Sequence, residues 1–193
     1  MSDKKPSFPI TKNLDSYLSF YNRKLIIPIF YEDLKRFSGS VSVFNEKDID
    51  TLWVRVFYSD FERKEIDESL KRVYNLLHSD GNEANVEFLN VDAIDYCTFG
   101  NSKPFRVKIR NILNDNFTYF YVKQADASRI YGLELEHILS PDNLNFLVYQ
   151  NTLIEEHIAG IPGDEFFNDF LSKCNASEKA QIAKEFVKFN ERC

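Results

Sequence analysis

The chain has 193 residues, of which 44% are hydrophobic and 28% charged, with only six glycines and six prolines. These values are ordinary for a globular protein of one domain or slightly more, and they exclude a collagen-like or low-complexity chain. Thirty acidic residues against 24 basic ones give a net charge of −6, which disfavours a general nucleic-acid-binding protein.

No segment predicts secretion or insertion into a membrane. The N-terminus lacks the apolar core of a signal peptide, and the longest nearby apolar stretch, Leu25–Tyr31, has only seven residues. A membrane span needs about 20. The three cysteines form no CxxC pair, and no HExxH sequence is present, so neither a disulfide framework nor a metal site is expected. We therefore expect a cytoplasmic protein without a membrane or nucleic-acid partner.

Residues 1–82 are predicted to form a small α+β cap. The predicted elements are helices over 14–21, 31–37 and 62–78 and strands over 41–44 and 52–58. The third helix has the clearest pattern, because Ile66, Leu70 and Val73 fall at helical spacing. No motif in this part of the chain indicates a particular chemistry. It is therefore expected to cap the next domain or to bind a protein partner.

Residues 83–160 are predicted to form a five-stranded, mostly antiparallel sheet with one packed helix. The predicted strands lie at 86–95, 105–112, 117–123, 145–149 and 152–158, and the helix lies at 128–139, capped by Asp126 or Ser128. Short turns join the first three strands into an antiparallel meander. Two further helices are predicted within 161–193. The predicted fold class is therefore α+β, in three parts.

Two charged side chains of the middle part fall among apolar ones. On a helical wheel, Glu134 lies inside an apolar arc. The arc contains Ile130, Tyr131, Leu135, Ile138 and Leu139. Lys123 shares one face of its strand with Tyr119 and Tyr121. Buried charges are costly unless they are paired, so a Lys123–Glu134 ion pair would satisfy both groups. The alternative is a lysine that reaches solvent from the sheet edge and a half-exposed glutamate.

The order of these elements resembles the N-terminal lobe of the protein-kinase-like fold. The order is three antiparallel strands with a lysine at the end of the third, then a helix with an inward glutamate, and then two further strands. The resemblance covers roughly residues 87–193 and is nearest to uncharacterised bacterial kinase-like proteins. It implies that Lys123 holds the α- and β-phosphates of ATP and that Glu134 orients this lysine.

The segment 153–166, LIEEHIAGIPGDEF, resembles the hinge that follows the fifth strand in that family. The resemblance implies that the backbone at Glu156 and Ile158 meets adenine and that Asp164 or Glu165 approaches the ribose. The turn Phe99–Lys103 would hold the phosphate loop. The implied nucleotide-binding residues are Lys123, Glu134, Gly100, Glu156, Ile158 and Asp164.

Three features depart from the pattern of the family. The family's phosphate loop has three glycines, whereas this turn has only Gly100, and the spacing of eleven residues between Lys123 and Glu134 is short. No His-Arg-Asp or Asp-Phe-Gly sequence is present, so the aspartates that accept the substrate proton and hold magnesium are missing. We expect ATP to bind, with magnesium ligands supplied from outside this chain, and no catalysis by the chain alone. We accordingly expect the chain to be a fragment of a longer protein, with a catalytic lobe beyond Cys193.

Other charged groups indicate less specific functions. Glu155 and Glu156 alternate across a strand, so they cannot form the carboxylate pair of a glycosidase. A basic stripe on one strand is either a solvated face or a site for phosphate or an acidic partner. It consists of Arg106, Lys108 and Arg110. The alternative function is a non-enzymatic protein-interaction module without a nucleotide site, which would use residues 1–82 and the exposed strands.

Overall fold

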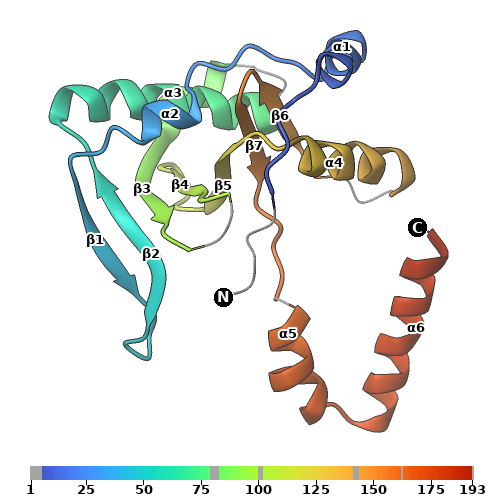
Figure 1. The fold of residues 1–193 in the computed structure, drawn as a ribbon. Coiled ribbons are helices and arrows are strands. Elements are labelled where there is room, and N and C mark those ends of the chain that lie inside the picture. Colours follow the sequence, from blue (N-terminus) through green and yellow to red (C-terminus); the bar gives the residue numbers. More distant parts are fainter. Residues whose placement is uncertain (1–5, 79–82, 100–101, 141–143, 162, 193) are drawn as a thin grey trace. The chain divides into compact units, whose positions relative to one another are not determined.

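The computed structural model describes residues 6–78, 83–99, 102–140, 144–161 and 163–192 (Figure 1). The chain divides into two compact units, one made of residues 1–133 and 145–157 and the other of residues 134–144 and 158–193. The predicted N-terminal cap and most of the predicted sheet domain therefore belong to the first unit together, whereas residues 134–144 and 158–160 of that domain belong to the second.

The elements follow the predicted order. The strands are β1 (Gly39–Phe44), β2 (Asp50–Phe57), β3 (Leu89–Cys97), β4 (Phe105–Asn111), β5 (Phe117–Gln124), β6 (Phe146–Tyr149) and β7 (Thr152–Glu156). The helices are α1 (Lys12–Phe20), α2 (Tyr31–Leu34), α3 (Asp60–His78), η1 (Glu83–Phe88), α4 (Ala127–Leu139), α5 (Gly163–Glu165), η2 (Phe166–Phe170), η3 (Leu171–Lys173) and α6 (Ala176–Arg192). The α+β class is confirmed.

The strands of the described residues form one antiparallel sheet in the order β1-β2-β3-β4-β5-β7-β6. It has seven strands rather than the predicted five, because β2 pairs with β3 and so adds the β1–β2 hairpin to the sheet. In this pairing Trp53–Arg55 lie opposite Asp95–Cys97. The two segments are some forty residues apart in the chain, and pairing over such a distance leaves no local sequence pattern.

One face of the sheet carries the hydrophobic core of the first unit. Helix α3 packs on this face, and its buried side chains Ile66, Leu70 and Val73 are those that the helical spacing predicted. The strands contribute alternate residues to the same core. These include Ile94, Phe105, Val107, Ile109, Phe120, Val122 and Ile154. Phe105 is fully buried and its ring lies 4.8 Å from that of Tyr96 and 5.5 Å from that of Tyr31, so aromatic contacts fill the centre of this layer.

The other face of the sheet carries charged and aromatic side chains. Asp95, which is only 2% exposed, binds Arg55 and Arg106 at 2.9 Å each. The Arg106 guanidinium also lies 4.6 Å from the centre of the Trp53 ring. Further along β4, Arg110 lies 3.0 Å from Asp92. Carboxylates of β3 therefore neutralise the arginines of the predicted basic stripe.

Helix α4 buries a narrower side than the helical wheel predicts. Ile130, Leu133 and Glu134 are at most 4% exposed, which confirms that Glu134 faces inward. The predicted apolar arc is wrong at its other members, which are 50–65% exposed. These are Tyr131, Leu135, Ile138 and Leu139. The wheel assigns every apolar residue to the buried side, whereas only a narrower stripe of the helix is buried in the structure.

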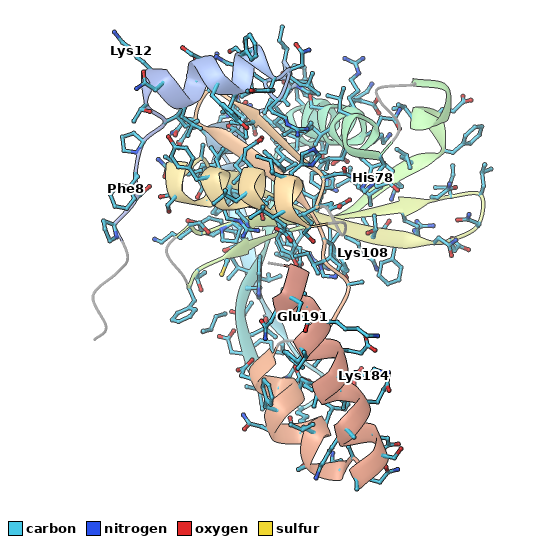
Figure 2. The ribbon with its side chains drawn as sticks, turned by 90° about the vertical axis from the view of Figure 1, so that its right-hand side faces the viewer. Phe8, Lys12, His78, Lys108, Lys184 and Glu191 are labelled. Carbon is cyan, nitrogen blue, oxygen red and sulfur yellow. The ribbon has the colours of Figure 1, made fainter. Side chains whose placement is uncertain are left out.

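The segment before α1 is bound to the beginning of α4, although 118 residues separate the two (Figure 2). The Phe8 N–H donates to the Asp126 carboxylate at 2.9 Å, and the Ala127 N–H donates to the Phe8 carbonyl at 2.8 Å. Thr11 then caps α1, since its side chain accepts from the Leu14 N–H. The segment from residue 6 onward is therefore part of the first unit.

The second unit contains the C-terminal helices. Asn175 and Glu178 form a reciprocal capping pair at the start of α6, with bonds of 2.8 and 2.9 Å. The ring of Phe167 in η2 lies 6.1 Å from that of Phe186 in α6, so the two helical segments pack through aromatic side chains. In the part of the chain that the structure describes, no helix combines the length and the apolar character needed to cross a bilayer.

Candidate functional site

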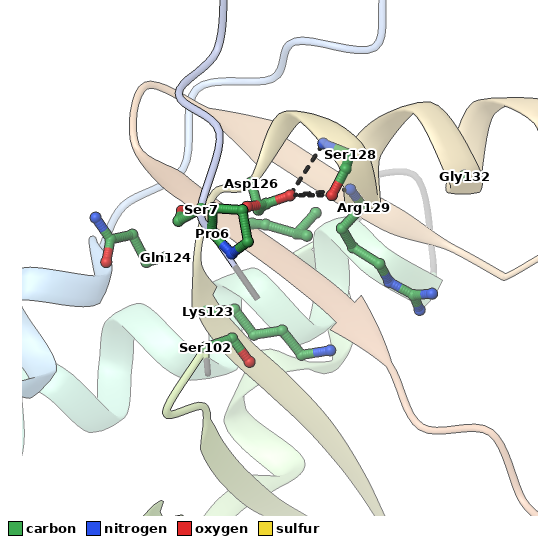
Figure 3. Close-up of a pocket in the computed structure, with 10 residues that line it drawn as sticks. Pro6, Ser7, Ser102, Lys123, Gln124, Asp126, Ser128, Arg129 and Gly132 are labelled. Carbon is green, nitrogen blue, oxygen red and sulfur yellow. Dashed lines mark hydrogen bonds between the residues drawn. The ribbon is translucent and has the colours of Figure 1, made fainter. Parts of the chain in front are cut away.

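A pocket of about 420 Å³ lies where β5 ends and α4 begins (Figure 3). Its walls come from the N-terminal segment, the turn between β3 and β4, the end of β5, the first turns of α4 and strand β7. The lining residues are Pro6, Ser7, Ser102, Lys123, Gln124, Asp126, Ser128, Arg129, Gly132 and Leu153. All of them belong to the first unit. Most of these side chains are polar, and the volume is that of a typical site for a small molecule.

Two cations of this pocket share one buried carboxylate. Lys123 Nζ lies 2.7 Å from Glu155 Oε2, and Arg129 donates to both oxygens of Glu155 at 2.8 and 3.0 Å. Glu155 is 3% exposed, whereas the side chains of Lys123 and Arg129 are 20% and 44% exposed. The carboxylate is therefore the buried member of the group, and the two cations line the pocket.

The ionisation of Glu155 follows from these contacts. Burial alone raises the pKa of a carboxyl group, but the hydrogen bond from Arg129 and the charge of Lys123 outweigh burial here. The pKa of Glu155 consequently lies below its ordinary value. Lys123, Arg129 and ionised Glu155 together carry one net positive charge, which is suitable for holding an anion at the exposed ends of the cations.

Asp126 closes the first turn of α4. Its carboxylate accepts from the backbone N–H of Ser128 at 2.9 Å and of Arg129 at 3.3 Å, as the predicted cap requires. Burial opposes the ionisation of Asp126, but hydrogen bonds from Ser128, the Phe8 backbone and Ser7 lower its pKa to about 2. The Asp126 carboxylate would therefore repel an anionic ligand at the start of the helix. Such a ligand would bind on the side of Lys123 and Arg129.

The predicted site residues are distributed as follows. Lys123 lines the pocket, and Glu134 is buried on α4. The ion pair that the structure shows for Lys123 runs to Glu155, so the pairing of Lys123 with Glu134 stays a prediction. Glu134, Asp164 and Ile158 lie in the second unit, and Gly100 lies outside the described residues.

Glu156 has several contacts of its own. Its backbone N–H donates to the Asn145 carbonyl at 3.0 Å, and its side chain accepts from Asn145 and lies 3.8 Å from His78. Glu155 and Glu156 thus contact different residues, in agreement with their predicted alternation. An adenine ring that used the Glu156 N–H would have to replace the bond to Asn145.

Sequence reasoning missed Glu155 and Arg129 as members of the site. The only local signal is that Glu155 falls on the strand face opposite to that of Glu156. Placing Glu155 beside Lys123 requires the pairing of β5 with β7, in which Tyr121 lies opposite Glu155. This pairing brings together strands that α4 and β6 separate in the chain.

The pocket suits a phosphate-bearing ligand better than a metal ion alone. Lys123 and Arg129 are donors without acceptor capacity, and the hydroxyl group of Ser102 adds a further donor, whereas the Ser128 hydroxyl already donates to Asp126. Among the described residues, no three His, Cys, Asp or Glu side chains are grouped so that they could hold a metal ion.

Comparison of the chain with models of protein families, with curated proteins and with solved structures finds no match.

Proposed function

We propose that residues 89–156 form a kinase-like nucleotide-binding lobe in which Lys123 binds the phosphates of ATP. The observation that carries the proposal is that Lys123 and Ser102 line one pocket. Lys123 comes from the end of the third strand of this region, and Ser102 from the turn between its first two strands. These are the positions that the resemblance assigns to the phosphate-binding lysine and to the phosphate loop.

The order of elements supports the same proposal. The antiparallel strands β3, β4 and β5 are followed by α4, and α4 is followed by β6 and β7, which extend the sheet beside β5. Glu134 is buried on α4, as the resemblance requires of the helix glutamate. The proposal concerns binding, because no residue of this chain is assigned the catalytic or magnesium-holding role.

Arg129 gives this proposed site a second cation. It starts α4 close to Lys123 and shares Glu155 with it, so a polyphosphate could be held by two positive groups. Glu155 then keeps both cations at fixed positions in the absence of ligand. Pre-positioned donors reduce the ordering cost of binding.

The test is calorimetric titration with ATP and Mg²⁺, together with thermal shift, since a ligand that binds only the folded state must stabilise it. We expect binding at millimolar ATP or below, weakening by at least about tenfold in Lys123→Ala, which corresponds to about 1.4 kcal/mol. Lys64→Ala is the matched control, because it removes an exposed lysine of α3 outside the pocket.

Removing Lys123 alone leaves Glu155 with one cation fewer and can destabilise the fold. The double variant Lys123→Met with Glu155→Gln removes both charges and keeps the side-chain volumes similar. It should remain folded, with the lower stability expected when Arg129 loses the Glu155 carboxylate, and should also lose ATP binding. Failure of the wild type to bind ATP at millimolar concentration, or unchanged affinity in both Lys123 variants, contradicts the proposal.

The second candidate, a protein-interaction module, is supported by strand β1. This strand lies at the outer edge of the sheet and carries exposed Val41 and Phe44. Binding through this edge would need no nucleotide.

A further inference from the structure

Among the residues that the structure describes, strand β1 has no neighbouring strand on its outer edge. It is the first strand in the order of the sheet and pairs with β2 on one side only. Every second backbone N–H and C=O group of such a strand points away from the sheet and can pair with another chain.

This edge lacks the features by which proteins usually prevent such pairing. Protected edge strands carry charged side chains or proline, are very short, or are twisted away by a bulge. The six residues of β1, GSVSVF, contain no charge and no proline, and the irregularity of the β1–β2 pairing lies only at its end, between Val43 and Phe44. Val41 and Phe44 are 54% and 53% exposed. The strand is therefore well suited to backbone pairing.

We infer that β1 pairs antiparallel with β1 of a second copy of this chain, with the two-fold axis at Ser42. A two-fold axis brings the same surface of both copies together, so the strand must be compatible with itself. In this register Ser42 lies opposite Ser42 of the second copy, and Val41 lies opposite Val43. Apolar pairs thus meet across the interface, and no like charges lie opposite each other within the strand.

Charges beyond the strand favour a second copy over an unrelated peptide. The same register brings the β1–β2 turn of one copy level with the segment before β1 of the other. The turn contains exposed Glu46, Lys47 and Asp48, which carry one net negative charge, and the facing segment contains exposed Lys35 and Arg36. Lys35 and Arg36 pair locally with Glu32 and Asp33 at 3.0 and 3.7 Å, but such exposed pairs contribute little and can exchange partners. Both ends of the interface carry this opposite-charge arrangement.

A disulfide scan tests the register directly. In a background in which Cys97, Cys174 and Cys193 are replaced by serine, Ser42→Cys should form a covalent dimer on mild oxidation, because directly opposite residues of antiparallel strands lie about 4.5–5.5 Å apart between Cα atoms. Ser40→Cys is the matched control on the same strand face. Position 40 lies opposite Phe44, and the two introduced thiols would be about 13 Å apart along the strand, too far for a disulfide.

Light scattering of the wild-type chain gives the second readout. We expect twice the 22.7 kDa chain mass at high concentration. Val41→Lys, which places a charge in the interface, should weaken dimerisation at least tenfold. Asp48→Arg should also weaken it, and adding Arg36→Asp should restore it by reversing both charges. A wild-type chain that stays monomeric at millimolar concentration, or equal cross-linking of Ser42→Cys and Ser40→Cys, overturns the inference. Neither readout depends on nucleotide binding.

Discussion

Arg129 donates two hydrogen bonds to the Glu155 carboxylate, at 2.8 and 3.0 Å, and thereby ties the first turn of α4 to strand β7. The two parallel bonds fix the orientation of both side chains, as paired arginine–carboxylate bonds do generally. Lys123 binds the same carboxylate from β5 at 2.7 Å. One buried acid therefore sets the positions of both cations in the proposed phosphate site.

Replacing Glu155 by glutamine should destabilise the fold. The amide cannot accept from Lys123 and Arg129 as a carboxylate does, and its NH₂ group would face their charges. Breaking a fully buried ion pair costs about 3–5 kcal/mol. Lys123 and Arg129 are partly exposed, so we expect a loss of about 2–3 kcal/mol in the free energy of unfolding. Urea denaturation measures it. Glu65→Gln, at an exposed position of α3, is the control, and equal losses in both variants would contradict this role of Glu155.

The stability of the chain should fall on acidification, and Asp126 should account for part of the loss. Its pKa is about 2 in the folded chain, below the value of 3.8 for a free side chain. A depressed pKa stabilises the fold above the unfolded pKa, and this contribution disappears as the pH falls from about 4 toward about 2. The lowered pKa of Glu155 acts in the same direction.

Asp126→Asn isolates this effect, because asparagine can still cap α4 but does not titrate. We expect a flatter dependence of the free energy of unfolding on pH below about 4 in this variant. Urea denaturation at about pH 2.5, 3.5, 5 and 7 measures the dependence. A wild-type slope retained in Asp126→Asn would show that other carboxyl groups are responsible.

The sequence predicts the elements well, because their patterns are local. The spacing of Arg106, Lys108 and Arg110 places them on one face of β4, and the residues that alternate with them, Phe105, Val107 and Ile109, are at most 1% exposed on the other face. The inward position of Glu134 was likewise predicted from helical spacing alone. Each of these predictions depends on residues within one element.

The site could be predicted only in part, because it is assembled by contacts between distant segments. The sequence identifies Lys123 as a cation among apolar residues. Its partner Glu155 is 32 residues away and contacts Lys123 only because β5 pairs with β7. The contact of Phe8 with Asp126 spans 118 residues and leaves no pattern in either segment. The two extra strands were assigned to a separate cap for the same reason.

Truncating Phe105 should be among the most damaging changes in the core. Its side chain is fully buried and lies among the rings of Tyr31, Tyr96 and Phe37, so Phe105→Ala leaves a large cavity. Such substitutions cost about 3–5 kcal/mol. Phe117→Ala on β5 is the control, because Phe117 is 56% exposed, and it should cost less than about 1 kcal/mol. Chemical denaturation compares the two, and similar losses would refute the assigned core.

The backbone conformation at Leu52 indicates a substitution that should stabilise the chain. Its φ angle of 61° places a branched side chain in the left-handed region, which costs an L-residue about 1–2 kcal/mol. Hydrogen bonds hold it there, since its carbonyl accepts from the N–H of Thr98 at 3.0 Å and from the Thr98 hydroxyl at 2.8 Å. The side chain is 45% exposed, so it contributes little to the core.

Leu52→Gly should therefore raise the free energy of unfolding by about 0.5–1 kcal/mol, because relief of the strained φ exceeds the entropic cost of glycine. Ile49→Gly provides the comparison. Ile49 is 58% exposed on the same hairpin and is not among the described residues with positive φ, so glycine there brings only the cost of about 0.5–1 kcal/mol. A higher free energy of unfolding in Leu52→Gly and a lower one in Ile49→Gly, measured by urea denaturation, would support backbone strain at Leu52. A loss of stability in both variants would show that the bonds from Thr98 and the exposed side chain outweigh this strain.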